Sequence, residues 1–255
     1  MVNKRHYFFA GLLIFLVQAC QSGDGTKDIR NFYFPLKTLE SGLVYEYAPQ
    51  GDTPASTAYW YYRTIIQDEE IHLTGTYYER DLIPQQLSNE LMTEAGMVLE
   101  ELYLFQPDTT GGDKQIQIPV SVVQDDVFPF RVRENGGVYL YHVAWESIDD
   151  PGAEMALIKN RRYLRDTTFQ LDGKSYPAIL FEVKELVSYD KDGVLEQQYD
   201  GKEIYAKGLG LVYYSKKVTE ALNLRYRLEK RYPMEQLEEQ FRSLYQRDAN
   251  PNGGE

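Results

Sequence analysis

Apolar residues recur at every second position through most of the chain beyond residue 42, in stretches rich in Val, Ile, Tyr, Phe and Trp. Tyr59 and Tyr61 fall on one face of such a stretch, whereas Trp60 and Tyr62 fall on the other. This alternation is typical of strands that present two different faces. The same pattern predicts strands at residues 43–47, 59–66, 71–79, 115–123, 137–145, 154–166, 176–189, 208–214 and 223–231.

Turn dipeptides separate several of these strands. They supply the positive-φ positions that tight hairpins need, and they are Asn135-Gly136, Asp172-Gly173, Asp192-Gly193 and Asp200-Gly201. Short connections join strands that are neighbours in space, so a meander is the simplest topology. We therefore expect a mainly β fold: a curved antiparallel sheet, either a half-barrel or a barrel-like meander. Neither a repeat nor a Pro/Ser-rich linker interrupts residues 32–247, which we interpret as one domain.

A helix is predicted near the C-terminus. Pro233 occupies a favourable first helical position, and Met234, Leu237, Phe241 and Leu244 form one apolar stripe. Residues 248–255 are expected to form a disordered tail. The pattern of residues 85–103 is compatible with either helix or strand, because its leucines fit a helical stripe that a glycine interrupts.

The first twenty residues have the organisation of a secretion signal. Lys4 and Arg5 precede an uncharged and mostly apolar run of eleven residues, 7–17, which is shorter than the roughly 20 residues that a spanning helix needs. The run ends in Val17-Gln18-Ala19-Cys20, which resembles the lipobox of bacterial lipoproteins. The resemblance implies cleavage after residue 19, a diacylglyceryl thioether on Cys20 and acylation of its amine. Cys20 is the only cysteine of the chain, so it has no partner for an internal disulfide.

Residues 20–31 are expected to form a flexible tether, because the stretch after Cys20 is small, polar and without periodicity. Gln21 stands where many lipoproteins retained at the inner membrane have Asp, so we expect a lipid anchor in the bacterial outer membrane. Some bacterial groups use an early acidic residue as a surface-export signal, and Asp24 is one. The protein would therefore face the periplasm or the cell surface.

The charge of the chain argues against nucleic acid as a partner. The net charge is −12, and removal of Lys4 and Arg5 with the signal takes it to −14. Such a balance repels a phosphate backbone.

Two short motifs resemble a family of uncharacterised bacterial envelope lipoproteins, a domain of unknown function. The first is Tyr33-Phe34-Pro35-Leu36, followed by Gly42 and alternating tyrosines; the second is Tyr205-Ala206-Lys207-Gly208-Leu209-Gly210-Leu211-Val212. The resemblance implies a twisted, curved antiparallel sheet, similar to the half-barrels of lipoprotein carriers, and it implies no established activity.

Catalytic, metal and cofactor motifs are weak. Gly208-Leu209-Gly210 lacks the third glycine of a dinucleotide loop, because Tyr213 occupies that position. A calcium loop starting at Asp190 would lack its distal acid. His72 and His142 are the only histidines after the signal, and no nucleophile elbow is present. We therefore expect no cofactor, no metal and no enzymatic activity.

Basic residues suggest a binding surface. Two strands carry them at alternating positions: Lys159, Arg161, Tyr163 and Arg165 in one, and Arg225, Arg227 and Arg231 in the other. If these strands are neighbours, the side chains form a cationic stripe suited to an anionic glycolipid, a peptide or the acidic patch of a partner. The alternative is a solvated outer face balanced by acids on adjacent strands.

Three functional hypotheses follow. The first is a membrane-anchored, non-catalytic module that binds or assembles an envelope protein, glycan or lipid. The second is a carrier or sensor of an apolar or lipid ligand, held in a half-barrel that the C-terminal helix closes. The third is an enzyme of unknown type.

Overall fold

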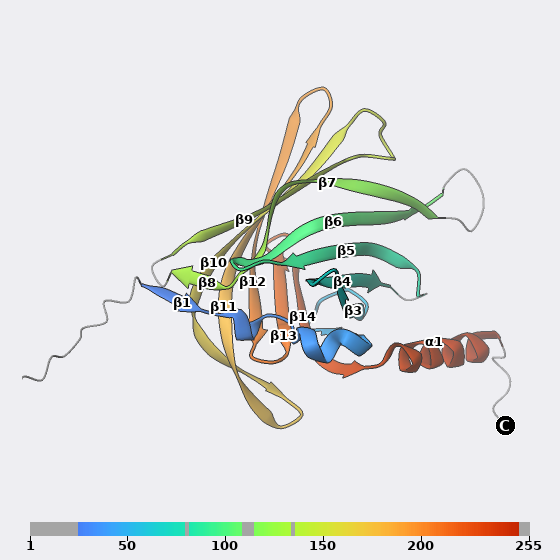
Figure 1. Ribbon diagram of the computed structural model, residues 1–255. Coiled ribbons are helices and arrows are strands. Elements are labelled where there is room, and N and C mark those ends of the chain that lie inside the picture. The colour runs from blue at the N-terminus through green and yellow to red at the C-terminus, as the bar shows by residue number, and fades with distance from the viewer. Residues whose placement is uncertain (1–24, 80–81, 109–114, 134–135, 250–255) are drawn as a thin grey trace, which may run out of the picture.

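The computed structural model describes residues 25–79, 82–108, 115–133 and 136–249. Within these ranges twelve antiparallel strands close into a barrel, in the order β10-β11-β12-β13-β14-β2-β3-β4-β5-β6-β7-β9 (Figure 1). They are β2 (Leu43–Pro49), β3 (Ala58–Gln67), β4 (Glu70–Tyr78), β5 (Pro84–Met92), β6 (Gly96–Pro107), β7 (Gln115–Pro129), β9 (Val138–Glu146), β10 (Glu154–Leu171), β11 (Lys174–Asp190), β12 (Val194–Ala206), β13 (Gly210–Lys217) and β14 (Asn223–Tyr232). The meander is confirmed, but the sheet is a closed barrel and not a half-barrel, because β14, the last strand of the meander, pairs with β2, the first.

The N-terminal segment closes one end of the barrel. β1 (Thr26–Asp28) pairs with β8 (Arg131–Arg133), and two short 3-10 helices follow, η1 (Arg30–Phe32) and η2 (Leu36–Ser41). Ile29 is fully buried. Residues 26–31 therefore belong to the folded domain, which corrects the predicted extent of the tether. The predicted signal, residues 1–19, and Cys20 lie outside the described residues.

Residues 85–103 form strands β5 and β6, which reverse direction between Met92 and Gly96. Leu87 and Leu91 of β5 are four residues apart, and a spacing of four satisfies both a helical stripe and one face of a strand. Gly96 interrupts the helical stripe and is needed at the start of β6, because a Cβ at this position would lie 2.4 Å from the carbonyl oxygen of Phe128 on β7. The backbones of β6 and β7 approach each other closely at this point.

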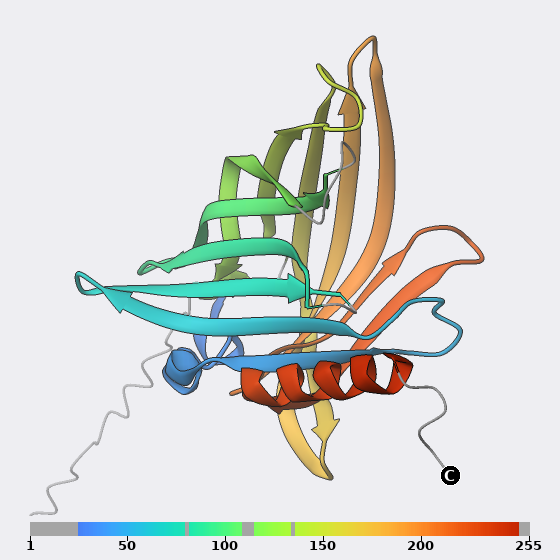
Figure 2. The same cartoon turned by 90° about the vertical axis from the view of Figure 1, so that its right-hand side faces the viewer.

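The C-terminal helix, α1 (Met234–Ala249), lies against the outside of the barrel (Figure 2). Leu237 and Phe241 are buried against Val44 of β2 and Tyr232 of β14, on the outer face of these strands. The helix is confirmed, but it is not a lid over the interior. It includes residues 248 and 249 of the predicted tail, and residues 250–255 and the side chain of Leu244 lie outside the described part. No helix among the described residues is long and apolar enough to cross a membrane.

The two motifs, although far apart in the sequence, meet at the closed end of the barrel. The amide of Gly208 donates a hydrogen bond to the carbonyl oxygen of Asn31 at 3.2 Å, and the Phe34 ring lies against Gly210. Tyr45 donates its hydroxyl proton to the carbonyl oxygen of Leu209 at 2.9 Å. Together these contacts seat the aromatic side chains of the N-terminal segment inside the barrel.

Candidate functional site

A cavity of about 460 Å³ lies inside the barrel, bounded on one side by Tyr33 and Phe34 of the N-terminal segment. Pockets for small molecules typically measure roughly 300–1,000 Å³ and are mostly apolar. The lining fits this description, because most of its side chains are aliphatic or aromatic. The cavity has an aromatic wall, an aliphatic wall and a separate cluster of charged residues.

One wall is aromatic and comes from β3, β4, β13 and β14. Trp60 stacks on Tyr77 with ring centroids 5.2 Å apart and on Tyr62 at 5.7 Å. Tyr214 stacks on Tyr226 at 4.9 Å. These residues occupy the inward positions of their strands. Residues at the alternate positions point outward, as does Tyr59, whose ring packs on α1. The stacked rings present a continuous apolar surface.

A second wall is largely aliphatic and comes from β6, β9 and β10. Leu102, Leu104, Val143 and Leu157 line it together with Trp145. The chain has two tryptophans, Trp60 and Trp145, and both line the cavity, one in each wall. Intrinsic fluorescence therefore reports on the contents of the cavity from two sides.

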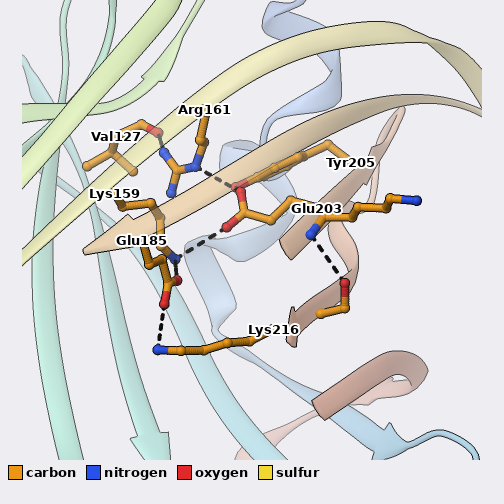
Figure 3. Close-up of polar contacts among 9 residues, drawn as sticks. Val127, Lys159, Arg161, Glu185, Glu203, Tyr205 and Lys216 are labelled. Carbon is orange, nitrogen blue, oxygen red and sulfur yellow. Dashed lines mark hydrogen bonds and ion pairs between the residues drawn. The ribbon is translucent and has the colours of Figure 1, made fainter. Parts of the chain in front are cut away.

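A cluster of ion pairs faces the cavity from four consecutive strands (Figure 3). The Lys159 ammonium on β10 lies 3.1 Å from a Glu185 carboxylate oxygen on β11 and 3.4 Å from a Glu203 oxygen on β12. Arg161 donates from Nε to Glu203 at 2.8 Å, and Lys216 on β13 lies 2.6 Å from the other oxygen of Glu185. Three cations thus share two carboxylates.

Arg161 and Glu203 form the most buried pair of this cluster, with side chains 9% and 7% exposed. Arg161 also donates from Nη1 to the carbonyl oxygen of Val127, and Tyr205 donates its hydroxyl proton to Glu203 at 3.2 Å. Burial opposes ionisation of both glutamates, but the cations outweigh it: Arg161 and Lys159 lower the pKa of Glu203, and Lys159 and Lys216 bring the pKa of Glu185 to about 2. Both carboxylates are therefore ionised at neutral pH.

Glu90 on β5 faces the cavity without a cationic partner of this kind. Its carboxylate accepts a hydrogen bond from the Tyr33 hydroxyl, and no described ammonium or guanidinium nitrogen lies within ion-pair distance of it. Burial raises its pKa to about 7, against the opposing effects of the Tyr33 hydrogen bond and the more distant Arg161. Glu90 is the titratable group of the cavity near neutral pH.

The predicted basic strand at residues 159–165 divides between two faces. Lys159, Arg161 and Tyr163 point inward, and Tyr163 hydrogen-bonds to Asp166 at 2.8 Å. A β-bulge at Leu164 shifts the register, so that Arg165 pairs with Leu180 and lies on the exposed outer face. The stripe therefore ends at the bulge.

The second predicted group does not join the first. Three strands, β11 to β13, separate β10 from β14, so the two strands are not neighbours and the condition for one continuous cationic stripe is not met. Arg225 and Arg227 point outward; the guanidinium of Arg227 lies 4.4 Å from the centre of the Phe169 ring, and that of Arg225 packs close to Gly51. A second bulge, between Leu228 and Lys230, places Arg231 beside Tyr45, 5.5 Å from its ring centre.

Several site residues escape prediction from the sequence: Glu90, Glu185, Glu203, Lys216, Trp60 and Trp145. The usable signal is a charged residue at the inward position of an alternating strand, as in Glu203-Ile204-Tyr205. This signal identifies an inward charge, but its partner depends on strand order and register, which single strands do not reveal.

No family model and no curated protein matches the sequence. Among solved structures, the chain is similar to a candidate lipoprotein from Parabacteroides distasonis, at 11% identity and TM-score 0.49, over 81% of this chain and 100% of that one. It is also similar to an exported protein from Bacteroides fragilis described as having a YmcC-like fold, at 12% identity and TM-score 0.47, over 79% and 99% of the two chains.

A third similarity is to the hypothetical lipoprotein YmcC from Escherichia coli. The identity is 9% and the TM-score 0.32, over 80% of this chain and 90% of that one. At such values the similarities establish neither a family nor a ligand. The function has to be inferred from the cavity itself.

Proposed function

We propose that the protein is a lipid-anchored, non-catalytic envelope protein that binds an amphiphilic molecule, with the apolar part of the ligand inside the barrel. The observation that carries the proposal is the cavity of about 460 Å³ between an aromatic and an aliphatic wall. Apolar side chains that line an accessible cavity stay in contact with water, which costs free energy in proportion to their exposed apolar area. An apolar ligand would remove that penalty.

The place where the described chain begins supports an orientation of the barrel relative to the membrane. The described chain begins at Gly25, next to β1 at the closed end, five residues after Cys20. Five extended residues span at most roughly 18 Å. With lipid on Cys20, the closed end of the barrel would stay near the outer membrane. The cavity would open on the opposite side, beside Lys216, whose side chain is 32% exposed.

The test is native mass spectrometry with lipid extraction on the protein expressed with its own signal and purified from membranes. We expect a bound apolar molecule in addition to the anchor. Leu157→Trp fills the aliphatic wall and should remove it, whereas Leu195→Trp, at a position 70% exposed on β12, should retain it. The absence of any adduct from the wild-type protein, or its retention by Leu157→Trp, would contradict the proposal.

A further inference from the structure

The cations that line the cavity outnumber the carboxylates that pair with them. Lys159, Arg161 and Lys216 supply three cations, and Glu185 and Glu203 supply two carboxylates that accept from all three. Glu90, the remaining acidic residue of the lining, is hydrogen-bonded to an uncharged tyrosine. A carboxyl group without a cationic partner in an apolar site favours its neutral form. The cavity then holds one positive charge in excess.

Lys216 is the cation best placed to meet a ligand. Its side chain is 32% exposed, compared with 22% for Lys159 and 9% for Arg161. One ion pair, with Glu185 at 2.6 Å, uses one of its three ammonium hydrogens. The ammonium also lies 4.1 Å from the centre of the Tyr199 ring, which holds the side chain beside the cavity.

We propose that the ligand carries an anionic head group, which Lys216 binds at the cavity rim with Lys159 and Arg161 behind it. This inference rests on the proposed function and deepens it, because it names the charge of the ligand. The apolar part would then lie between Trp60 and Trp145, away from the ion pairs. An anion neutralises the excess charge, whereas a cationic head group would add to it at a low local dielectric.

The electrostatics of the cluster agree with this geometry. Glu185 and Glu203 are ionised at neutral pH and so already balance two of the cations. Glu90, whose pKa burial raises to about 7, is largely protonated below that value. The charge left for a ligand to neutralise is therefore carried by the lysine–arginine cluster and not by surface residues.

Three probes with one common bromoalkyl chain separate the charge of the head group from the apolar contribution: a sulfonate, the matching alcohol and the matching trimethylammonium salt. Their charges do not change with pH. Dissociation constants would be measured on the full mature protein from the change in tryptophan fluorescence, at mildly acidic pH. We expect the sulfonate to bind about tenfold more tightly than the alcohol, as one charge-assisted contact implies, and the ammonium to bind most weakly.

Lys216→Met keeps an apolar side chain and leaves Glu185 paired with Lys159, so the barrel should fold. It should abolish the preference for sulfonate over alcohol. Lys217→Met is the matched control, because this lysine neighbours Lys216, is 46% exposed and pairs with Glu220. Lys216→Glu should reverse the order of sulfonate and ammonium.

The outcomes separate the two proposals. If none of the probes binds the wild-type protein, the proposed function itself fails. If all three bind equally, or if Lys216→Met keeps the sulfonate preference, the ligand still occupies the cavity but the assignment of an anionic head group at Lys216 is overturned.

Discussion

Phe34 and Gly210 are in direct contact at the closed end of the barrel: a Cβ added to Gly210 would lie 2.4 Å from Cδ1 of the Phe34 ring. The contact joins the two motifs, which lie far apart in the sequence. Phe34 also packs on Tyr62 with ring centroids 4.3 Å apart, so the glycine fixes the position of an aromatic residue that bounds the cavity.

Gly210→Ala should therefore destabilise the protein strongly. The residue has φ +88°, which is unfavourable for any side chain by about 1 kcal/mol or more, and the clash with Phe34 should add about 2 kcal/mol. Gly208→Ala is the control, because Gly208 has φ +73° but nothing within 4 Å of its added Cβ. Urea denaturation should show a loss of about 3 kcal/mol for the first variant and about 1 kcal/mol for the second.

The same pair permits a double-mutant cycle. In a Phe34→Ala background, Gly210→Ala should lower the free energy of unfolding by only about 1 kcal/mol, which is the cost of its backbone conformation. Equal effects of the glycine substitution in both backgrounds would show that the ring does not need the space above Gly210.

The buried pair Arg161–Glu203 yields a second prediction. Arg161→Met leaves Glu203 buried with only Lys159 as a charged partner, so the free energy of unfolding should fall by about 3 kcal/mol. Adding Glu203→Gln should restore much of the loss. Arg162→Met is the matched control: this arginine follows on β10, is 50% exposed and pairs with Glu182 at 2.6 Å. Its substitution should change stability by less than about 1 kcal/mol. Comparable losses for both arginines would contradict the assignment of Arg161 to the interior.

Glu90 should give stability a pH dependence of defined sign. Its pKa rises from 4.5 to about 7 on folding, so the folded state binds the extra proton between these values. Stability therefore falls as pH rises through this window, by up to about 3 kcal/mol. Glu90→Gln removes the titration but keeps a partner for Tyr33, so its gain over the wild type should grow between about pH 5 and about pH 8.

Thermal or urea unfolding of both proteins across this range measures the difference. Glu94→Gln, at an exposed position in the same hairpin, serves as the control and should follow the wild type. A difference between Glu90→Gln and the wild type that stays constant across this range would show that folding does not raise the pKa of Glu90. The groups that face Glu90 and contribute to its environment are Tyr33, Tyr62, Tyr141, Tyr205 and Arg161.

Strand positions and their faces could be predicted from the sequence because each depends on local alternation. The alternation places Trp60 and Tyr62 on one face and Tyr59 on the other, and the structure shows that the face of Trp60 and Tyr62 is the interior. The stripe of α1 is equally local: Leu237 and Phe241 are buried in the positions expected. Closure of the barrel is not local, since it depends on the pairing of β14 with β2, which lie far apart in the sequence.

The site could be predicted only in part, for the same reason. Lys159 and Arg161 were candidates, but their partners Glu185 and Glu203 come from strands whose register is set by the whole sheet. Two bulges alter the predicted stripe, since one turns Arg165 outward and another carries Arg231 to Tyr45. Strand order separates Arg225 and Arg227 on β14 from Lys159 and Arg161 on β10. A single inserted residue exchanges the two faces of a strand, and alternation within a strand does not reveal it.

Fluorescence quenching by a bromine atom on the ligand shows whether the barrel cavity holds an apolar chain. Trp60→Phe and Trp145→Phe each leave one tryptophan, in opposite walls of the cavity. A brominated alkyl alcohol should quench the remaining tryptophan to saturation in both single-tryptophan proteins, and Leu157→Phe should weaken binding in both. Quenching that increases without saturation, or that reaches only one of the two tryptophans, would contradict a ligand enclosed between these walls.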